Sequence, residues 1–448
     1  LLAEIFAGKR PKAVTEITEK DRRLPVVRIA AAGGTAVAAS AASQYQGLTI
    51  AVWQAPADRG HARGSGVRDL RLFRNGSLVK MWHGAVRLDT HGRAVLHAEV
   101  RVVAGENHFT AYAFNHDNIK SADADLNTTG ADALKHKGTA YLLAIGVDHY
   151  SNSSFDLKYA GADAQDFAQQ VRQQQEKLGN FEAVPVISLL DAQATRANIL
   201  EAFARLAGKV SGPPAAGAPA DLAKIKKAQP EDAVFIFFAG HGMAEGARFY
   251  LIPHDLGYAG ARDAIDKAAM KLLMEHGISD QSLDAAFEGI DAGQMALVID
   301  ACNSGQALEA EEKRRGPMNS RGLAQLAYEK GMYILTAAQG YQQAQEINQL
   351  GHGLLTYALV EEGLKQGKAA GADGNVYMRG WLDYAVRKVP QLQWEWLRGA
   401  LHTSRAVRLK GGATASDPAQ LGMQRPRVFY RRDVGAQPFV VGKPAAKQ

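Results

Sequence analysis

The stretch Val234-Phe235-Ile236-Phe237-Phe238-Ala239-Gly240-His241-Gly242 decides the fold, because an apolar run leads directly into a histidine flanked by glycines. A continuous apolar run of this kind is typical of a strand that is buried on both faces. A second run, at residues 295–299, leads into Asp300-Ala301-Cys302-Asn303-Ser304-Gly305. Ligands of open α/β proteins bind outside the carboxyl ends of parallel strands, which meet at one edge of the sheet. We therefore expect His241 and Cys302 to lie together at that edge.

The surrounding sequence alternates between strand and helix patterns. Other buried strands are predicted from continuous apolar runs at residues 141–147, 184–190 and 332–336. Helices are predicted from apolar residues at helical spacing over residues 160–171, 195–206, 279–287 and 354–363. This alternation predicts an α/β fold with a mostly parallel sheet and helices on both of its faces.

The N-terminal part of the chain follows a different pattern. Short stretches with turn residues between them predict strands at residues 47–53, 67–73, 94–100 and 109–114. Such spacing indicates a small antiparallel β-sandwich of the immunoglobulin-like kind over residues 26–123. No constellation of reactive side chains lies in this segment, so we interpret it as a support or recognition module. Residues 1–25 are interpreted as a leader, and residues 124–138, rich in Ala, Asp, Thr and Gly, as a linker.

Composition and charge limit the class of function. The 448 residues include 52 Lys and Arg against 46 Asp and Glu, which gives a formal net charge of +6. The basic residues are scattered apart from the cluster Lys313-Arg314-Arg315, which favours a solvated surface over a nucleic-acid interface. No apolar window approaches the ~20 residues of a membrane helix, and the chain opens on no signal-peptide pattern. We expect a cytoplasmic protein with neither a nucleic-acid nor a membrane partner.

The single cysteine of the chain, Cys302, excludes internal disulfides and multi-cysteine zinc sites. A lone cysteine is often a small buried apolar residue, so its surroundings decide how it is interpreted. A thiol with a pKa near ~8.5 needs a neighbouring imidazole to react at neutral pH. The glycines around His241 predict a tight turn, close substrate approach and an N–H free to face an oxyanion. A second Gly-His-Gly, at residues 351–353, precedes a helix and does not end an apolar strand, so His352 is interpreted as structural.

Three motifs of the chain, at residues 141–150, 238–242 and 299–305, resemble those of caspase-like cysteine peptidases, in particular bacterial caspase homologues and metacaspases. The histidine precedes the cysteine, as it does by some ~50 residues in caspases. The resemblance covers residues 139–435, which leaves 436–448 as a C-terminal tail. It implies a caspase-like sheet flanked by helices, which follows the smaller β-sandwich along the chain. That sandwich resembles the small domain that precedes such a peptidase in some bacterial proteins with WD-repeat propellers.

The resemblance also implies a mechanism without a cofactor. Cys302 attacks the peptide carbonyl, His241 protonates the leaving amine, and no third catalytic residue is required. The N–H groups of Gly242 and Cys302 form the oxyanion hole. Calcium activates some metacaspases, but no acidic loop of this chain has the spacing of an EF-hand, so no metal site is predicted and calcium stays an open alternative.

The primary specificity pocket departs from that of caspases that cut after Asp. Those enzymes carry Gln two residues before the cysteine, where this chain has Asp300. Relatives that cleave after basic residues carry acidic side chains at places that Asp300, Asp163 and Glu346 match. Such carboxylates favour Arg or Lys in a substrate. The alternatives are that Asp163 is a charge at a helix N-terminus and that Glu346 is a solvated loop residue.

Basic residues after the cysteine match this specificity and predict self-cleavage, at Lys313, Arg314, Arg315 or Arg321. The expected partners are a peptide or protein substrate and a regulatory protein bound by the N-terminal sandwich. Two other functions stay open: a catalytically silent scaffold with the caspase fold, and a signalling module gated by a partner. Labelling of Cys302 by a substrate-like electrophile separates an active site from a silent one.

Overall fold

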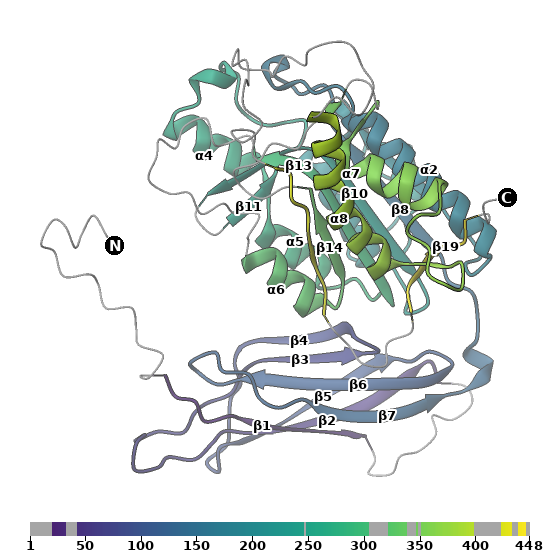
Figure 1. Cartoon of the computed structure of the whole chain (residues 1–448). Coiled ribbons are helices and arrows are strands. Elements are labelled where there is room, and N and C mark those ends of the chain that lie inside the picture. Colours follow the sequence, from purple (N-terminus) through teal and green to yellow (C-terminus); the bar gives the residue numbers. More distant parts are fainter. Residues whose placement is uncertain are drawn as a thin grey trace, which may run out of the picture. The chain divides into compact units, whose positions relative to one another are not determined.

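The computed structural model describes residues 20–32, 43–245, 248–303, 321–337, 346–347, 351–397, 423–431 and 438–444. For residues 244, 302, 303, 321, 346, 347 and 397 it describes the backbone alone. The chain divides into two compact units, with the division between Lys135 and His136 (Figure 1). The first is rich in β-structure and the second is an α/β domain, as the sequence predicts.

The N-terminal unit contains two antiparallel sheets. One has the strand order β1 (Val26–Ala31), β2 (Tyr45–Trp53), β5 (Arg93–Arg101), and the other has the order β4 (Ser77–Ala85), β3 (Arg68–Arg74), β6 (Gly105–Phe114), β7 (Ala124–Gly130). Alternate residues of β2, such as Leu48 and Ile50, are buried and share one apolar cluster with Leu70 and Leu72 of β3. Two sheets around a common core form the predicted sandwich.

Strand β7 corrects the predicted boundary between the units. It pairs with β6 along its whole length, from Ala124 to Gly130, so the prediction of a linker over residues 124–138 is wrong for this part. Ala, Asp and Gly are weak strand formers, but Ala124 and Leu126 pack against the sandwich core. Residues 21–23 of the predicted leader are also tied to the module, because the Asn115 amide donates hydrogen bonds to two of their carbonyls. Residues 1–19 lie outside the described residues.

The sheet of the second unit is mostly parallel. Its central strand, β10 (Ala233–Glu245), lies between β8 (Ala140–Gly146) and β13 (Gln294–Asn303). The parallel strands continue outward to β9 (Val186–Leu190) on one side and β14 (Tyr333–Thr336) on the other. Three antiparallel strands complete the sheet: β18 (Arg427–Phe429) beside β14, β11 (Arg248–Leu251) beside the second half of β10, and β12 (Ile278–Ser279) beside β11.

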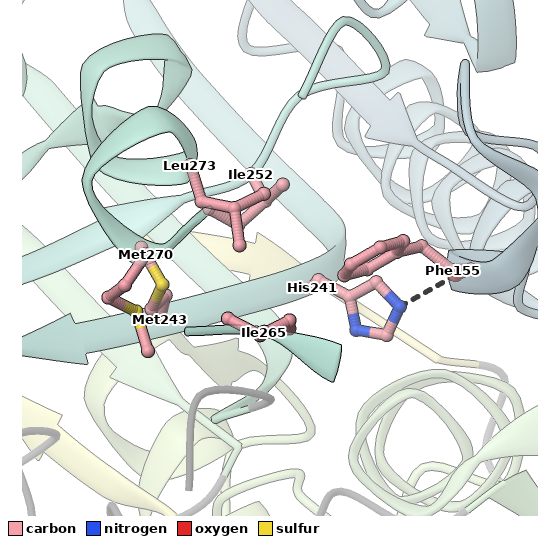
Figure 2. Close-up of a pocket in the computed structure, with 7 residues that line it drawn as sticks. All are labelled: Phe155, His241, Met243, Ile252, Ile265, Met270 and Leu273. Carbon is pink, nitrogen blue, oxygen red and sulfur yellow. Dashed lines mark hydrogen bonds between the residues drawn. The ribbon is translucent and has the colours of Figure 1, made fainter. Parts of the chain in front are cut away.

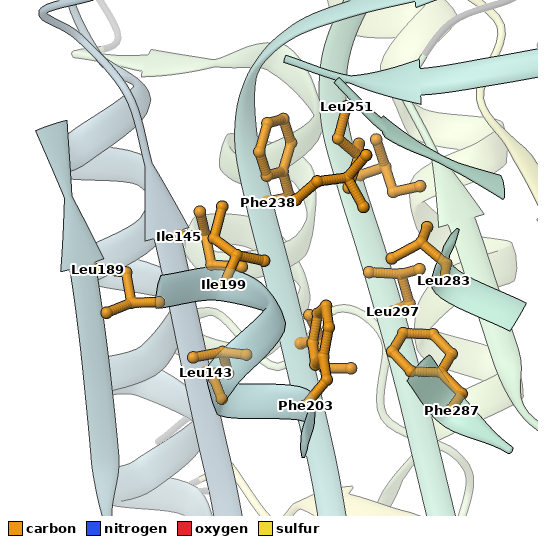
Figure 3. Packing of buried hydrophobic residues seen from close by; sticks show 14 of the residues in the cluster. Leu143, Ile145, Leu189, Ile199, Phe203, Phe238, Leu251, Leu283, Phe287 and Leu297 are labelled. Atoms are coloured by element: carbon orange, nitrogen blue, oxygen red, sulfur yellow. The ribbon is translucent and has the colours of Figure 1, made fainter. Parts of the chain in front are cut away.

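Helices cover both faces of this sheet, as predicted. One face packs on α3 (Arg196–Leu206), α4 (Lys267–His276), α5 (Asp280–Phe287) and α6 (Arg321–Lys330). Figure 3 shows Phe203 and Phe287 of α3 and α5 against strand residues such as Phe238. The other face packs on α2 (Ala160–Leu178), α7 (Leu354–Thr356), the π-helix η9 (Tyr357–Lys365) and α8 (Met378–Leu397). No helix in the described part of the chain is both long and apolar enough to cross a membrane.

The last described strand corrects the C-terminal boundary. β19 (Val440–Gly442) pairs with β17 (Val376–Tyr377), and Val441 is fully buried. The prediction of a tail over residues 436–448 is therefore wrong for β19. The apolar run Phe439-Val440-Val441 supplies enough buried surface to hold this strand in the domain.

Candidate active site

His241 and Cys302 are register partners on neighbouring strands. The parallel ladder between β10 and β13 runs from Ala233 opposite Gln294 to Gly242 opposite Asn303, and it sets His241 opposite Cys302. Neighbouring strands lie about 4.8 Å apart, so the two positions are adjacent at one edge of the sheet. The side chain of Cys302 is not among the described ones.

The strands continue further than the sequence predicts. His241 and Cys302 lie inside β10 and β13, and β10 extends to Glu245 because β11 pairs with it there. The predicted tight turn at the glycines around His241 is therefore wrong. Gly240 serves a different purpose, since a Cβ at this position would lie 2.8 Å from the Tyr150 hydroxyl oxygen.

Two hydrogen bonds hold His241 in place. Its backbone N–H donates a 2.7 Å hydrogen bond to the Tyr150 hydroxyl oxygen. Its ring Nε2 lies 2.7 Å from the carbonyl oxygen of Phe155 (Figure 2). A carbonyl oxygen can only accept, so Nε2 carries the proton, and in the neutral ring Nδ1 carries the lone pair. The side chain is buried, with 1% of the residue exposed. This tautomer leaves Nδ1 as the nitrogen that can take a proton from a nucleophile.

Tyr150 and Phe155 come from the loop that follows β8. The loop is shaped by its own polar side chains: Asp156 accepts from the Tyr150 N–H, and Asn152 accepts from the Ser154 N–H at the start of the 3-10 turn η3 (Ser153–Phe155). No sequence signal marks the role of Phe155, because this residue contacts His241 through its backbone carbonyl. Tyr150 lies in one of the motifs noted above, but no role was predicted for it.

An apolar pocket borders His241 on the side of β11 and α4. Figure 2 shows its lining side chains, which are Phe155, Met243, Ile252, Ile265, Met270 and Leu273. Apolar walls keep water away from one side of the imidazole and strengthen its polar contacts on the other side.

The three predicted specificity residues come together around Gly353. A Cβ on this glycine would lie 3.0 Å from Oδ2 of Asp300 and 3.1 Å from Oδ2 of Asp163. Both aspartates are buried, and Asp300 Oδ2 also accepts a 2.9 Å hydrogen bond from the Thr356 hydroxyl. Glu346, in β15 (Glu346–Ile347), is the cross-strand partner of Gly353 in β16 (His352–Gly353), although its side chain is not described. This arrangement can hold a cation.

His352, which the sequence predicted to be structural, contacts two carboxylates of α2. Its Nδ1 lies 2.8 Å from Oδ1 of Asp163, and its Nε2 lies 3.2 Å from Oδ2 of Asp166. The hydrogen bond to Asp163 raises the pKa of His352, in spite of its burial. Asp163 in turn accepts a 3.0 Å hydrogen bond from the Gly353 N–H through Oδ2.

Asp166, His352 and Glu361 lie close enough to share a metal ion. Lys365, however, forms ion pairs with both Asp166 and Glu361, and His352 faces carboxylates through both ring nitrogens. Two cationic groups already lie among these acids, so we assign the cluster to an ion-pair network and not to a metal site.

The predicted self-cleavage residues fall in two classes. Lys313, Arg314 and Arg315 lie outside the described residues. Arg321 is the first residue of α6, so the peptide bond after it lies in the first turn of a helix.

Comparison with protein-family models gives one match. A family model described as the caspase domain matches residues 139–373. No curated protein matches the chain.

Solved structures give weak likenesses. The fibronectin(III)-like modules of Clostridium thermocellum CbhA have 14% identity and a TM-score of 0.12, covering 19% of this chain and 77% of that one. Astrotactin-2, a vertebrate-specific perforin-like membrane protein, has 12% identity and a TM-score of 0.18, covering 45% of this chain and 32% of its own. A putative polysaccharide deacetylase of Bacillus anthracis, BA0330, has 10% identity and a TM-score of 0.15. The match covers 61% of this chain and 70% of the deacetylase. Scores this low carry no argument.

Proposed function

The chain belongs to the caspase family of peptidases, and from this premise we propose that it is a cysteine endopeptidase that uses His241 and Cys302 as its catalytic dyad and cleaves after Arg or Lys. A peptidase domain of this family implies peptide or protein substrates. The observation that carries the proposal is the register between β10 and β13, which makes the only histidine–cysteine pair of neighbouring strands in the described sheet.

The proposed reaction starts at the imidazole. With Nε2–H bonded to the Phe155 carbonyl, Nδ1 takes the thiol proton of Cys302, and the thiolate attacks the scissile carbonyl. The resemblance assigns the oxyanion that forms to the N–H groups of Gly242 and Cys302, which lie in the paired part of β10 and β13. Nδ1–H then protonates the amine as the C–N bond breaks, which leaves an acyl-enzyme. Water, deprotonated by Nδ1, attacks this thioester, and the acid leaves as the thiol is restored.

The proposed specificity follows from the acidic residues around Gly353. Asp300 precedes Cys302 by two residues, which is ~6.6 Å along a strand and within reach of an extended Arg or Lys side chain. Buried carboxylates attract a cation more strongly than solvated ones and repel a substrate aspartate. Asp163 and Glu346 add to this field from two other elements.

The test is the cleavage of matched fluorogenic peptides that differ only in Arg, Lys or Asp before the scissile bond. The assay is run on the wild type and on Cys302→Ala, with calcium and with a chelator. We expect turnover of the Arg and Lys peptides by the wild type alone. Equal turnover of the Asp peptide overturns the specificity.

A silent scaffold gives a different result. In that case no peptide is cleaved, and an Arg-containing acyloxymethyl ketone leaves Cys302 unlabelled in mass spectra. Covalent labelling of Cys302, lost in His241→Gln, supports the dyad even when the physiological substrate is unknown.

A further inference from the structure

The second Gly-His-Gly of the chain lies at the acidic site and not at the dyad. His352 immediately precedes Gly353, the residue around which Asp163 and Asp300 converge. Its imidazole lies against Asp163 and Asp166, which are one helical turn apart on α2, through its two ring nitrogens. The side chain is largely buried, with 14% exposed. It therefore fills a defined place between α2 and β16.

The arrangement gives Asp163 a fixed orientation. Oδ1 of this carboxylate faces His352 Nδ1 at 2.8 Å, and Oδ2 accepts from the Gly353 N–H at 3.0 Å. With both oxygens engaged, the carboxylate cannot rotate without losing a hydrogen bond. Oδ2 of Asp163 and Oδ2 of Asp300 both lie close to the position that a Cβ on Gly353 would take, at 3.1 Å and 3.0 Å.

The charges explain why a histidine is needed there. Two buried carboxylates that approach one point repel each other, and like charges at this range push one of them towards its protonated form. A neutral carboxyl group attracts a guanidinium much less than an ionised one does. A cation bonded to one member of the pair offsets this repulsion.

The other charged groups around His352 complete this balance. Among the described side chains they are Asp163 and Asp166 from α2, Glu361 and Lys365 from η9, and Asp300 from β13. Lys365 pairs with Asp166 and Glu361, whereas His352 is a cation that faces Asp163 directly among the described side chains.

We propose that His352 is a positioning residue for basic substrates: its imidazolium holds Asp163 on the Gly353 N–H and keeps Asp163 and Asp300 ionised together. The inference rests on the proposed Arg/Lys specificity and extends it to a residue outside the dyad. His352 touches neither the scissile bond nor the dyad. A substitution of His352 should therefore change substrate affinity and leave the rate of the chemical step unchanged.

The kinetic test compares His352→Gln, which removes the charge, with His352→Lys, which keeps it, and with His97→Gln, an exposed histidine of the N-terminal unit, as control. For an Arg peptide we expect His352→Gln to raise KM about tenfold, the effect of one lost charge interaction, with kcat within about twofold. His352→Lys should recover most of the loss, and His97→Gln should match the wild type.

A measurement without turnover keeps the inference testable if a variant unfolds. The His352 ring signals are titrated by NMR in the wild type and in Asp163→Asn, and the ring should stay protonated to higher pH in the wild type. Titration at the same pH in both proteins overturns the inferred pairing.

The outcomes separate this inference from the proposed function. A wild type that cleaves Arg peptides, with His352→Gln unchanged or with kcat alone reduced, overturns the role of His352 and spares the basic specificity. A wild type that cleaves neither Arg nor Lys peptides overturns the specificity and this inference with it.

Discussion

The Nε2 atom of His241 lies 2.7 Å from the carbonyl oxygen of Phe155, across the edge of the sheet between β10 and the loop after β8. This contact takes the place that a carboxylate holds in a Ser-His-Asp triad, where it orients the imidazole and selects its tautomer. A carbonyl does this without a formal charge, so it stabilises the imidazolium of the proposed reaction less than a carboxylate would.

Removal of either member of the dyad should abolish peptidase activity. Cys302→Ala loses the nucleophile, and His241→Gln loses the base while it keeps a side-chain donor for the Phe155 carbonyl. We expect no measurable turnover in the first and a loss of at least about a thousandfold in kcat/KM in the second. Thermal unfolding of both variants should stay within a few degrees of the wild type. Residual activity in Cys302→Ala would show that another residue attacks.

Tyr150→Phe tests the hydroxyl that accepts from the His241 N–H. The variant leaves a buried donor without its acceptor, which costs about 1–3 kcal/mol of unfolding free energy. Because the same contact positions the histidine backbone, kcat should fall on the order of tenfold while KM changes little. Urea unfolding and steady-state kinetics measure the two effects. Tyr141→Phe, in β8 of the same domain but away from His241, is the matched control.

Asp300→Asn should remove the preference for basic residues. The change keeps the shape of the side chain and an oxygen that accepts from the Thr356 hydroxyl, so the fold should survive. The ratio of kcat/KM between Arg and Asp peptides should fall about a hundredfold. Turnover of both peptides is measured in the wild type and in Asp300→Asn. A ratio of kcat/KM values that stays at the wild-type value rejects Asp300 as a specificity residue.

The pKa of His352 predicts a change of stability with pH. A raised pKa in the folded state means that the protonated ring stabilises the fold, fully below the unfolded pKa near 6.5, and that this contribution is lost as pH rises through the folded pKa. His352→Lys keeps a cation over this range. The unfolding free energy of the wild type should therefore fall relative to that of His352→Lys between pH 5.5 and pH 9, as measured by urea titration. A constant difference would contradict the ion pair.

Self-cleavage should give fragments that end at Lys313, Arg314 or Arg315 before any that end at Arg321. The bond after Arg321 lies in the first turn of α6, and a peptidase binds substrates in extended form, so this turn must unwind first. Wild type and Cys302→Ala are incubated side by side, and intact masses are recorded over time. An active wild type that stays one chain rules out processing and leaves the peptidase proposal standing.

The sequence predicted those parts of the fold that local apolar patterns mark. The apolar runs that became β8, β10 and β13 fixed the parallel sheet and brought His241 and Cys302 to the same edge. The polar strand β7 and the two-residue strand β16 depend on tertiary partners, and no local pattern marks them. The partners of His352 could not be predicted for the same reason, because they lie on α2, almost 190 residues away in sequence.

The role of Phe155 was unpredictable for a different reason. Every residue has a backbone carbonyl, so the acceptor for His241 leaves no trace in the residue type. Asp300, Asp163 and Glu346, in contrast, could be named from the sequence only because they match acidic places in relatives that cleave after basic residues, and their role in specificity stays a prediction.

The ladder between β10 and β13 has a consequence for how such an enzyme changes over time. The reactive pair is held by main-chain hydrogen bonds, whereas the residues around Gly353 act through side chains from α2, β13 and β16. On the proposed roles, substitutions at Asp163, Asp300 and His352 would redirect the peptidase to other substrates without moving His241 and Cys302. Mutational drift and laboratory evolution could both use this independence, so that new substrate preferences arise while His241 and Cys302 stay in place.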